Sequence, residues 1–89
     1  MKQDEFIIIE EFCSFHEVEV SLLQDLEEMG IIELINIEEN LCIPCETVYK
    51  VERLIRLQRS FELRNQDLDL IDTLLKKIDQ LEKEIKMLK

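Results

Sequence analysis

The sequence predicts a mostly α-helical fold, a winged helix-turn-helix with a small β-hairpin and a long C-terminal coiled-coil helix. Apolar residues recur at helical spacing over most of the 89 residues. A β-branched stretch interrupts this spacing near residues 32–43, and a heptad pattern occupies the C-terminal end. With 36% charged and 46% hydrophobic residues, the composition is typical of a folded helical chain rather than a disordered one.

Two short helices joined by a tight turn are expected first. A helix over about residues 9–15 is predicted by the spacing i, i+3, i+4 and i+7 of Ile9, Phe12, Cys13 and His16. A turn at 16–18 leads into a second helix over about residues 19–29. The apolar spacing that indicates this helix begins in the turn, at Val18, and continues with Leu23, Leu26 and Met29. Gly30 follows at the position where a left-handed residue commonly ends a helix.

A β-hairpin, or wing, is expected over about residues 32–43, where two apolar runs flank the polar letters EEN. Its turn is weakly specified, because it contains neither Asn-Gly nor Asp-Gly. Pro44 ends the hairpin and suits the start of a third helix over about residues 45–63. In that helix the polar Gln58 occupies one apolar position.

A long fourth helix is expected over about residues 66–89, with Asn65 as a plausible N-cap. The domain boundary therefore falls between a winged helix-turn-helix at 1–64 and a dimerisation helix at 65–89. The heptad positions a and d are occupied by Ile71, Leu74, Ile78, Leu81, Ile85 and Leu88. Ile at a with Leu at d favours a coiled coil of two parallel helices. The repeat spans under three heptads, so the alternative is a helix folded back on its own domain.

The net charge of −10 is unevenly distributed. Residues 1–46 hold thirteen acids and one Lys, a charge of −12, whereas residues 47–89 hold eight acids and ten bases, a charge of +2. An acidic half repels phosphate backbones and attracts basic protein surfaces. Solubility alone is the alternative reading of such a charge.

Neither a membrane nor a secreted location is expected. The chain has no apolar run of about 18–20 residues, and its N-terminal apolar run is too short for a signal peptide. Three cysteines, an odd number, are typical of the reducing cytoplasm. We therefore expect a cytoplasmic protein.

No metal, cofactor or catalytic site is expected. Four residues have spacings that could supply zinc ligands, namely Cys13, His16, Cys42 and Cys45. Cys13 lies on the apolar face of the first helix, however, where a free cysteine behaves as a small hydrophobe. The chain has one His and no Gly-rich phosphate loop, so we expect a protein that is not an enzyme.

The side of the second helix that faces away from Leu23 and Leu26 is expected to bind a protein partner. It combines one apolar residue with three acids, and these residues are Glu19, Leu22, Asp25 and Glu28. An apolar anchor with a charged rim is the composition of a protein-binding patch. A single surface leucine, which is common, is the alternative reading.

A basic stripe on or just after the third helix supports a rival function, DNA binding. Its residues are Lys50, Arg53, Arg56, Arg59 and Arg64. Sequence readout requires Arg, Lys, Asn or Gln at base edges, and the exposed side of the second helix offers only Ser21 and Gln24. Internal ion pairing would explain the stripe equally well. We therefore expect no nucleic-acid partner.

Two segments, VEVSLLQDLEEMGII and VERLIRLQRSFEL, resemble the DNA-binding domain of MerR-type regulators. Where that family places Arg and Tyr on DNA, this chain has Ser21, Gln24 and Asp25, so the DNA function does not carry over. A closer resemblance is to the chaperone-modulator (CbpM-type) branch of the same superfamily. It is carried by IEEFC, LLQDLEEMGIIE and LIDTLLKKIDQLEKEIKML, and it covers about residues 7–89.

The resemblance implies a MerR-like fold and a protein partner. CbpM-type proteins bind the J-domain of a DnaJ-like co-chaperone and inhibit its cooperation with Hsp70, to which the J-domain presents a basic helix. MerR-type relatives pair their C-terminal helices antiparallel, in contrast to the parallel pairing that the a and d residues favour. We expect a homodimeric regulator of this kind. A DNA-binding MerR-type transcription regulator is the alternative, and an adaptor that only dimerises is a third.

Overall fold

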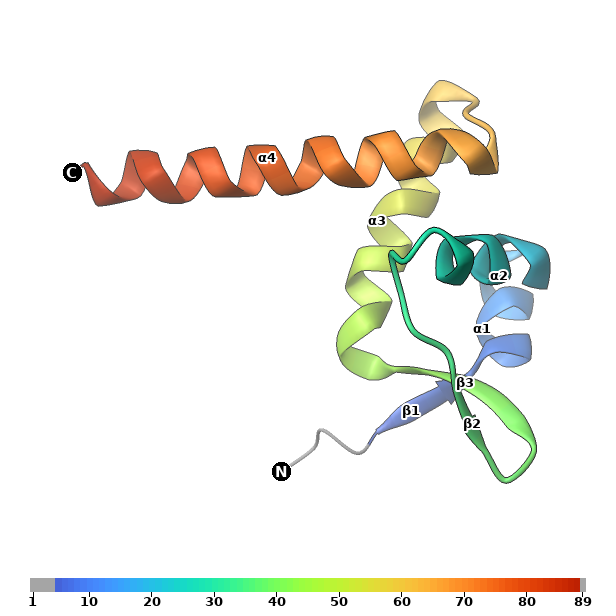
Figure 1. Ribbon diagram of the computed structural model, residues 1–89. Coiled ribbons are helices and arrows are strands. Elements are labelled where there is room, and N and C mark those ends of the chain that lie inside the picture. The colour runs from blue at the N-terminus through green and yellow to red at the C-terminus, as the bar shows by residue number, and fades with distance from the viewer. Residues whose placement is uncertain (1–4, 89) are drawn as a thin grey trace.

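The computed structural model describes residues 5–88 and has the predicted mostly helical architecture (Figure 1). In chain order its elements are β1 (Phe6–Ile8), α1 (Ile9–His16), α2 (Val20–Glu28), β2 (Ile35–Ile37), β3 (Asn40–Pro44), α3 (Cys45–Phe61), a 3-10 turn (Asn65–Asp67) and α4 (Leu68–Met87). Helices α1, α2 and α3 surround one core, and a small sheet closes its lower end in Figure 1. The β2–β3 hairpin is the predicted wing.

The core is built from the predicted apolar faces of the first three helices, together with the sheet and the start of α4. Its fully buried large side chains are Leu23, Leu26, Ile43, Val51, Leu54 and Leu68. Leu23 and Leu26 were predicted to face inward, and this is confirmed. Leu68 belongs to α4, and Ile71 and Leu75 pack partly against the same core. The first two turns of α4 are therefore part of the globular unit.

Gly30 ends α2 as predicted. Its φ of 80° is left-handed, a conformation that costs glycine little. Its N–H donates to the carbonyl of Glu27 at 2.9 Å, and the N–H of Ile31 donates to the carbonyl of Leu26 at 2.9 Å. This pair of bonds is the Schellman motif, which satisfies carbonyls that a helix end would leave unpaired.

Strand β1 was not predicted from the sequence. The sheet is antiparallel with the order β1-β3-β2, and Ile7 of β1 lies opposite Ile43 of β3. A strand of three residues is too short for the alternation of apolar and polar residues to be recognised. Strand β1 forms because β3, more than thirty residues later, pairs with it. The β-branched run of three isoleucines was the available signal.

The wing turns through two glutamates in an unfavourable backbone conformation. Glu38 and Glu39 have φ values of 50° and 69°, which are the two positive values of a type I′ hairpin turn. Residues with a Cβ adopt this region at a cost, whereas Asn and Gly are the usual residues there. The weak turn signal in the sequence therefore corresponds to a real local strain.

Replacing Glu38 with Asn and Glu39 with Gly is expected to raise the free energy of unfolding by about 1–2 kcal/mol, because the strain is relieved. Urea denaturation followed by circular dichroism measures the change. The double change to Gln is the control, since it removes both charges but keeps both side chains at positive φ. Equal stability of the Asn-Gly and Gln-Gln variants would show that charge, not backbone strain, explains the effect.

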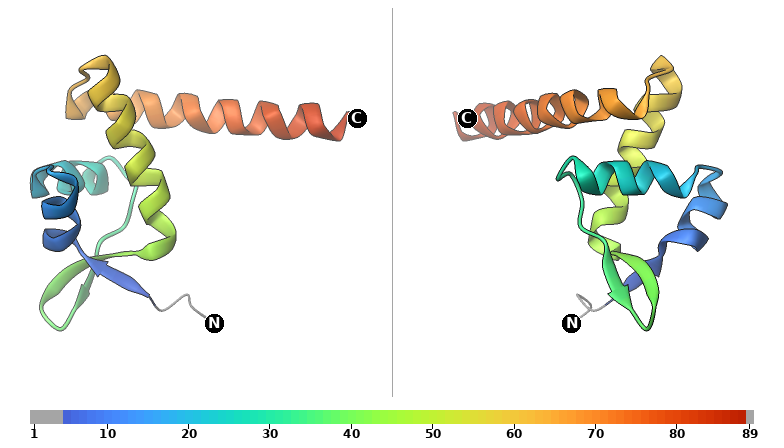
Figure 2. Two further views of the ribbon diagram at one scale, coloured as in Figure 1. Left: turned by 180° about the vertical axis from the view of Figure 1, so that it is seen from behind. Right: turned by 45° about the vertical axis from the view of Figure 1, so that its right-hand side comes forward.

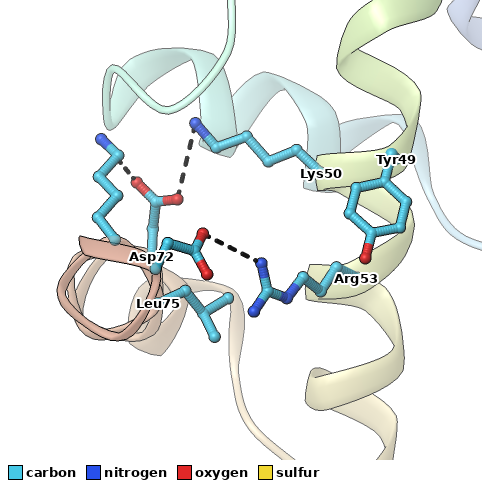
Figure 3. A pocket seen from close by; sticks show the side chains of 7 residues that line it. Tyr49, Lys50, Arg53, Asp72 and Leu75 are labelled. Carbon is cyan, nitrogen blue, oxygen red and sulfur yellow. Dashed lines mark hydrogen bonds and ion pairs between the residues drawn. The ribbon is translucent and has the colours of Figure 1, made fainter. Parts of the chain in front are cut away.

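Charged side chains hold the start of α4 on α3 (Figure 3). The carboxylate of Asp72 is only 7% exposed, and it lies 3.7 Å from Lys50 Nζ and 3.2 Å from Lys76 Nζ. Lys50 Nζ also donates to the carbonyl of Ile31 at 3.0 Å, just after α2. Breaking such a pair leaves an uncompensated charge in a partly buried site. Asp72 therefore ties α4 to Lys50 of α3, and Lys50 in turn holds the loop after α2.

Beyond this junction α4 leaves the globular unit and projects away from it in all views (Figures 1 and 2). The alternative of a helix folded back on its own domain is therefore wrong. Its exposed large apolar residues at the predicted a and d positions, here named the apolar stripe, are Leu74, Ile78, Leu81, Ile85 and Leu88. Ile71, the first predicted position, is half-buried against the core instead. Within residues 5–88, no helix is both long and apolar enough to cross a membrane.

Candidate partner-binding surface

The structure contradicts the predicted role of Leu22 as an exposed anchor. Leu22 is 4% exposed and belongs to the core cluster, like Leu23 and Leu26. Helical spacing alone predicts one narrow apolar stripe on α2. The buried face is wider, because α2 contacts α1 on one side and the segment after α3 on another. Leu22 is therefore a structural residue of the core and not an exposed one.

Asp25 is also not a free surface acid. It is half-buried, and its Oδ2 accepts a hydrogen bond from Asn65 Nδ2 at 2.9 Å. Asn65 Oδ1 in turn accepts from Gln58 Nε2 at 2.7 Å. Asn65 therefore joins α2 to α3 rather than capping α4, which begins at Leu68, so its predicted N-cap role is wrong. The bridge also explains the polar Gln58 within an apolar pattern.

The other two predicted partner-binding residues are exposed. Glu19 precedes α2 and its carboxylate lies 3.5 Å from Ser21 Oγ, and Glu28 lies at the C-terminal end of α2. Between them the exposed side of the helix carries Gln24 and Glu27. Glu27 was not among the predicted residues, although its position beside Glu28 could have indicated it.

A hollow of about 220 Å³ separates α2 from the wing, and we name it the acidic groove. It is lined by Ile8, Ile9, Glu10, Val20, Gln24, Glu39, Asn40 and Leu41. Carboxylates stand on two sides, Glu10 from α1 and Glu39 from the wing tip. Val20 and Leu41, which is 37% exposed, supply apolar surface. Leu41 is therefore an exposed apolar residue of this surface, as Leu22 was expected to be.

The acidic groove and the exposed side of α2 contain no cationic side chain. In the described part of the chain, Lys and Arg first occur at Lys50 and are absent over residues 5–49. A carboxylate surface attracts cationic groups and repels phosphates. The chemistry of this surface therefore suits a basic protein segment that also presents apolar side chains.

Most of the basic stripe is used inside the molecule. Lys50 bonds Asp72 and the carbonyl of Ile31, and Arg53 Nη1 lies 3.5 Å from Asp79 Oδ2. Arg59 Nη2 donates to the carbonyls of His16 at 2.6 Å and Glu17 at 3.2 Å, at the C-terminal end of α1, where a cation is favourable. Intramolecular contacts therefore account for three of the five cations.

The four residues considered as zinc ligands do not come together. Cys13 is buried in the core, and burial raises the pKa of its thiol, which keeps it protonated. The thiol of Cys42 donates to the carbonyl of Asn40 at 3.6 Å, and His16 Nε2 lies 3.3 Å from Glu52 Oε2. Over residues 5–88, no group of three or more His, Cys, Asp or Glu residues is placed to hold a metal ion.

Comparison with known proteins agrees with this geometry. The model of the family described as "MerR HTH family regulatory protein" matches residues 7–89, which include every helix and the wing. Neither the curated proteins nor the solved structures contain a match to the chain. The match covers almost the whole sequence, and the helix-turn-helix, wing and long final helix are in the expected order. The chain belongs to the MerR helix-turn-helix family of regulatory proteins.

Proposed function

We propose that this regulator binds the J-domain of a DnaJ-like co-chaperone and inhibits its cooperation with Hsp70. The observation that carries the proposal is the charge of the surface that would otherwise meet DNA. The exposed side of α2 and the acidic groove bear only acids and uncharged residues. This supports a basic protein partner over a nucleic acid. The free thiols of all three cysteines are compatible with action in the cytoplasm.

The proposed mechanism is competition for a basic surface. Glu19, Glu27 and Glu28 face the cations of the J-domain, while Leu41 and Val20 in the acidic groove receive an apolar side chain. The same basic surface is then covered and cannot meet Hsp70. Charges at such an interface mainly set the association rate and the choice of partner. Binding is therefore expected to weaken as salt concentration rises.

Reversing two charges on α2 tests this proposal. The variant Glu27→Lys with Glu28→Lys is expected to lower J-domain affinity by about tenfold or more, because repulsion replaces attraction at the interface. Both side chains are exposed, so the fold is retained. Calorimetric titration measures the affinity, and stimulation of Hsp70 ATPase by the co-chaperone measures the inhibition.

A matched control makes the same change in net charge elsewhere. Glu46→Lys with Asp69→Lys alters exposed acids on α3 and α4 and is expected to bind like the wild-type chain. Unchanged affinity in the α2 variant would show that the interface is wrongly placed. Absence of J-domain binding by the wild-type chain, with strongly salt-dependent binding to generic DNA, would favour a DNA-binding regulator instead.

We also propose that α4 pairs with α4 of a second copy. The apolar stripe supports this, since Leu74, Ile78, Leu81 and Ile85 are each 46–56% exposed although they repeat on one face. Apolar residues repeated at a and d positions bury one another in coiled coils. Lys77 and Glu84 lie beside the stripe and can pair with opposite charges across such an interface. Dimerisation would present two acidic grooves on one particle.

A further inference from the structure

A second hollow, of about 240 Å³, lies between α1 and the first half of α3, and we name it the aromatic groove. Its lining residues are Ile7, Glu11, Phe12, Phe15, His16, Val48 and Glu52. Glu10 lines the acidic groove, whereas the next residue, Glu11, lines this one. Consecutive helix residues point about 100° apart, so the two grooves occupy different flanks of α1.

Phe15 forms an exposed apolar wall of the aromatic groove. Its side chain is 83% exposed, and its ring meets His16 edge-on with the ring centres 5.0 Å apart. His16 also contacts the buried ring of Phe12 at 4.3 Å. A single exposed aromatic residue is not informative by itself. Here Phe15 lies beside the apolar residues Ile7, Phe12 and Val48, so a side chain bound in the groove would cover its ring.

The charges around the groove are acidic. Glu11 stands on the α1 wall beside Phe15, four residues away on the same helix face, and Glu52 stands on the α3 wall beside Val48. Glu52 Oε2 is 3.3 Å from His16 Nε2, and no Lys or Arg is among the lining residues. A guest flanked by cations is therefore favoured, and an acidic guest is repelled.

We propose that the aromatic groove is a docking site for a basic amphipathic segment of a partner protein, which inserts one large apolar side chain between two cations. The apolar side chain covers Phe12, Phe15 and Val48, while Lys or Arg residues on either side meet Glu11 and Glu52. The acidic residues 1–46 of a second copy would be repelled from it. This site is separate from the acidic groove and does not depend on the proposed binding of a J-domain.

Two synthetic helical peptides test the proposal, one of Leu and Lys at amphipathic spacing and one with Glu in place of Lys. Titration of the ¹⁵N-labelled full chain is expected to shift the amide signals of Phe15, Val48 and Glu52 with the Leu/Lys peptide only. Phe15→Ala is expected to lower this affinity by about tenfold or more, because buried aromatic anchors dominate such interfaces. Glu11→Lys is expected to lower it as well.

Phe61→Ala is the matched control, since Phe61 is also an exposed aromatic residue, 68% exposed, at the opposite end of α3. It is expected to leave the affinity unchanged. Shifts confined to α2 and the wing would overturn the proposal, as would equal binding of the Leu/Glu peptide or an unchanged affinity of Phe15→Ala. A change in the oligomeric state of Phe15→Ala would assign the groove to a second copy instead. If the wild-type chain binds the Leu/Lys peptide in the aromatic groove but does not bind a J-domain, only the proposed function is overturned.

Discussion

Leu22→Ala is expected to lower the free energy of unfolding by about 2–5 kcal/mol, the cost of a large cavity in a packed core. Leu22 is buried among the residues of α1, α2 and α3, and the helices around it cannot collapse fully onto the space. Domains of this size have a modest total stability, about 5–15 kcal/mol at most, so much of it would be lost. Urea denaturation measures the change.

The same variant separates a structural role from a binding role. Under conditions where it is folded, Leu22→Ala is expected to bind the J-domain as tightly as the wild-type chain. Leu41→Ala is the control with the opposite pattern, since Leu41 is partly exposed beside the acidic groove. It is expected to change stability little and to weaken partner binding. A Leu22→Ala chain with unchanged stability and lost binding would restore Leu22 as the anchor.

Leu81→Glu is expected to convert the proposed dimer to a monomer. Leu81 lies near the middle of the apolar stripe and is 54% exposed in the single chain, so the charge is well solvated in the monomer. In a dimer the two new carboxylates would be desolvated without a partner, at a cost of several kcal/mol. Sedimentation equilibrium measures the mass of the particle, and circular dichroism shows that the helices remain.

Lys83→Glu is the matched control for this change. Lys83 is also exposed on α4, but it lies outside the a and d positions, and the variant is expected to remain a dimer. A shortened chain that ends after Lys77 should be a folded monomer, because it keeps Leu68, Ile71 and Leu75 on the core. Persistence of the dimer in Leu81→Glu would show that the apolar stripe is not the interface.

Features that depend on neighbouring residues in the chain could be predicted from the sequence. The helical spacing that ends at Gly30 located α2, and the Schellman bonds of Gly30 and Ile31 are formed within that segment. The fourth helix and its heptad pattern were also predicted, since the pattern is local. The sequence leaves open whether that helix folds back on its own domain, and the structure decided it. The acidic character of the second helix could be read directly from its residues.

The roles of Leu22, Asp25 and Asn65 could not be predicted in this way. Leu22 is buried because elements distant in the chain widen the covered face of α2, and Asp25 bonds a residue 40 positions later. Strand β1 depends on β3 in the same manner. Each of these outcomes depends on a contact between segments that are far apart in the chain. The spacing of apolar residues within one segment does not indicate where the other segment lies.

The sequence by itself determined the helix-turn-helix order, the acidic charge of the second helix and the heptad pattern of α4, because these follow from the identity and spacing of residues along the chain. Only the tertiary structure decided which of those residues are exposed. It buried Leu22 in the core, left Leu41 exposed beside the acidic groove, and placed most of the basic stripe in intramolecular contacts. The physical reason is that exposure and pairing depend on packing between distant segments, which determines the side chains that remain in contact with water.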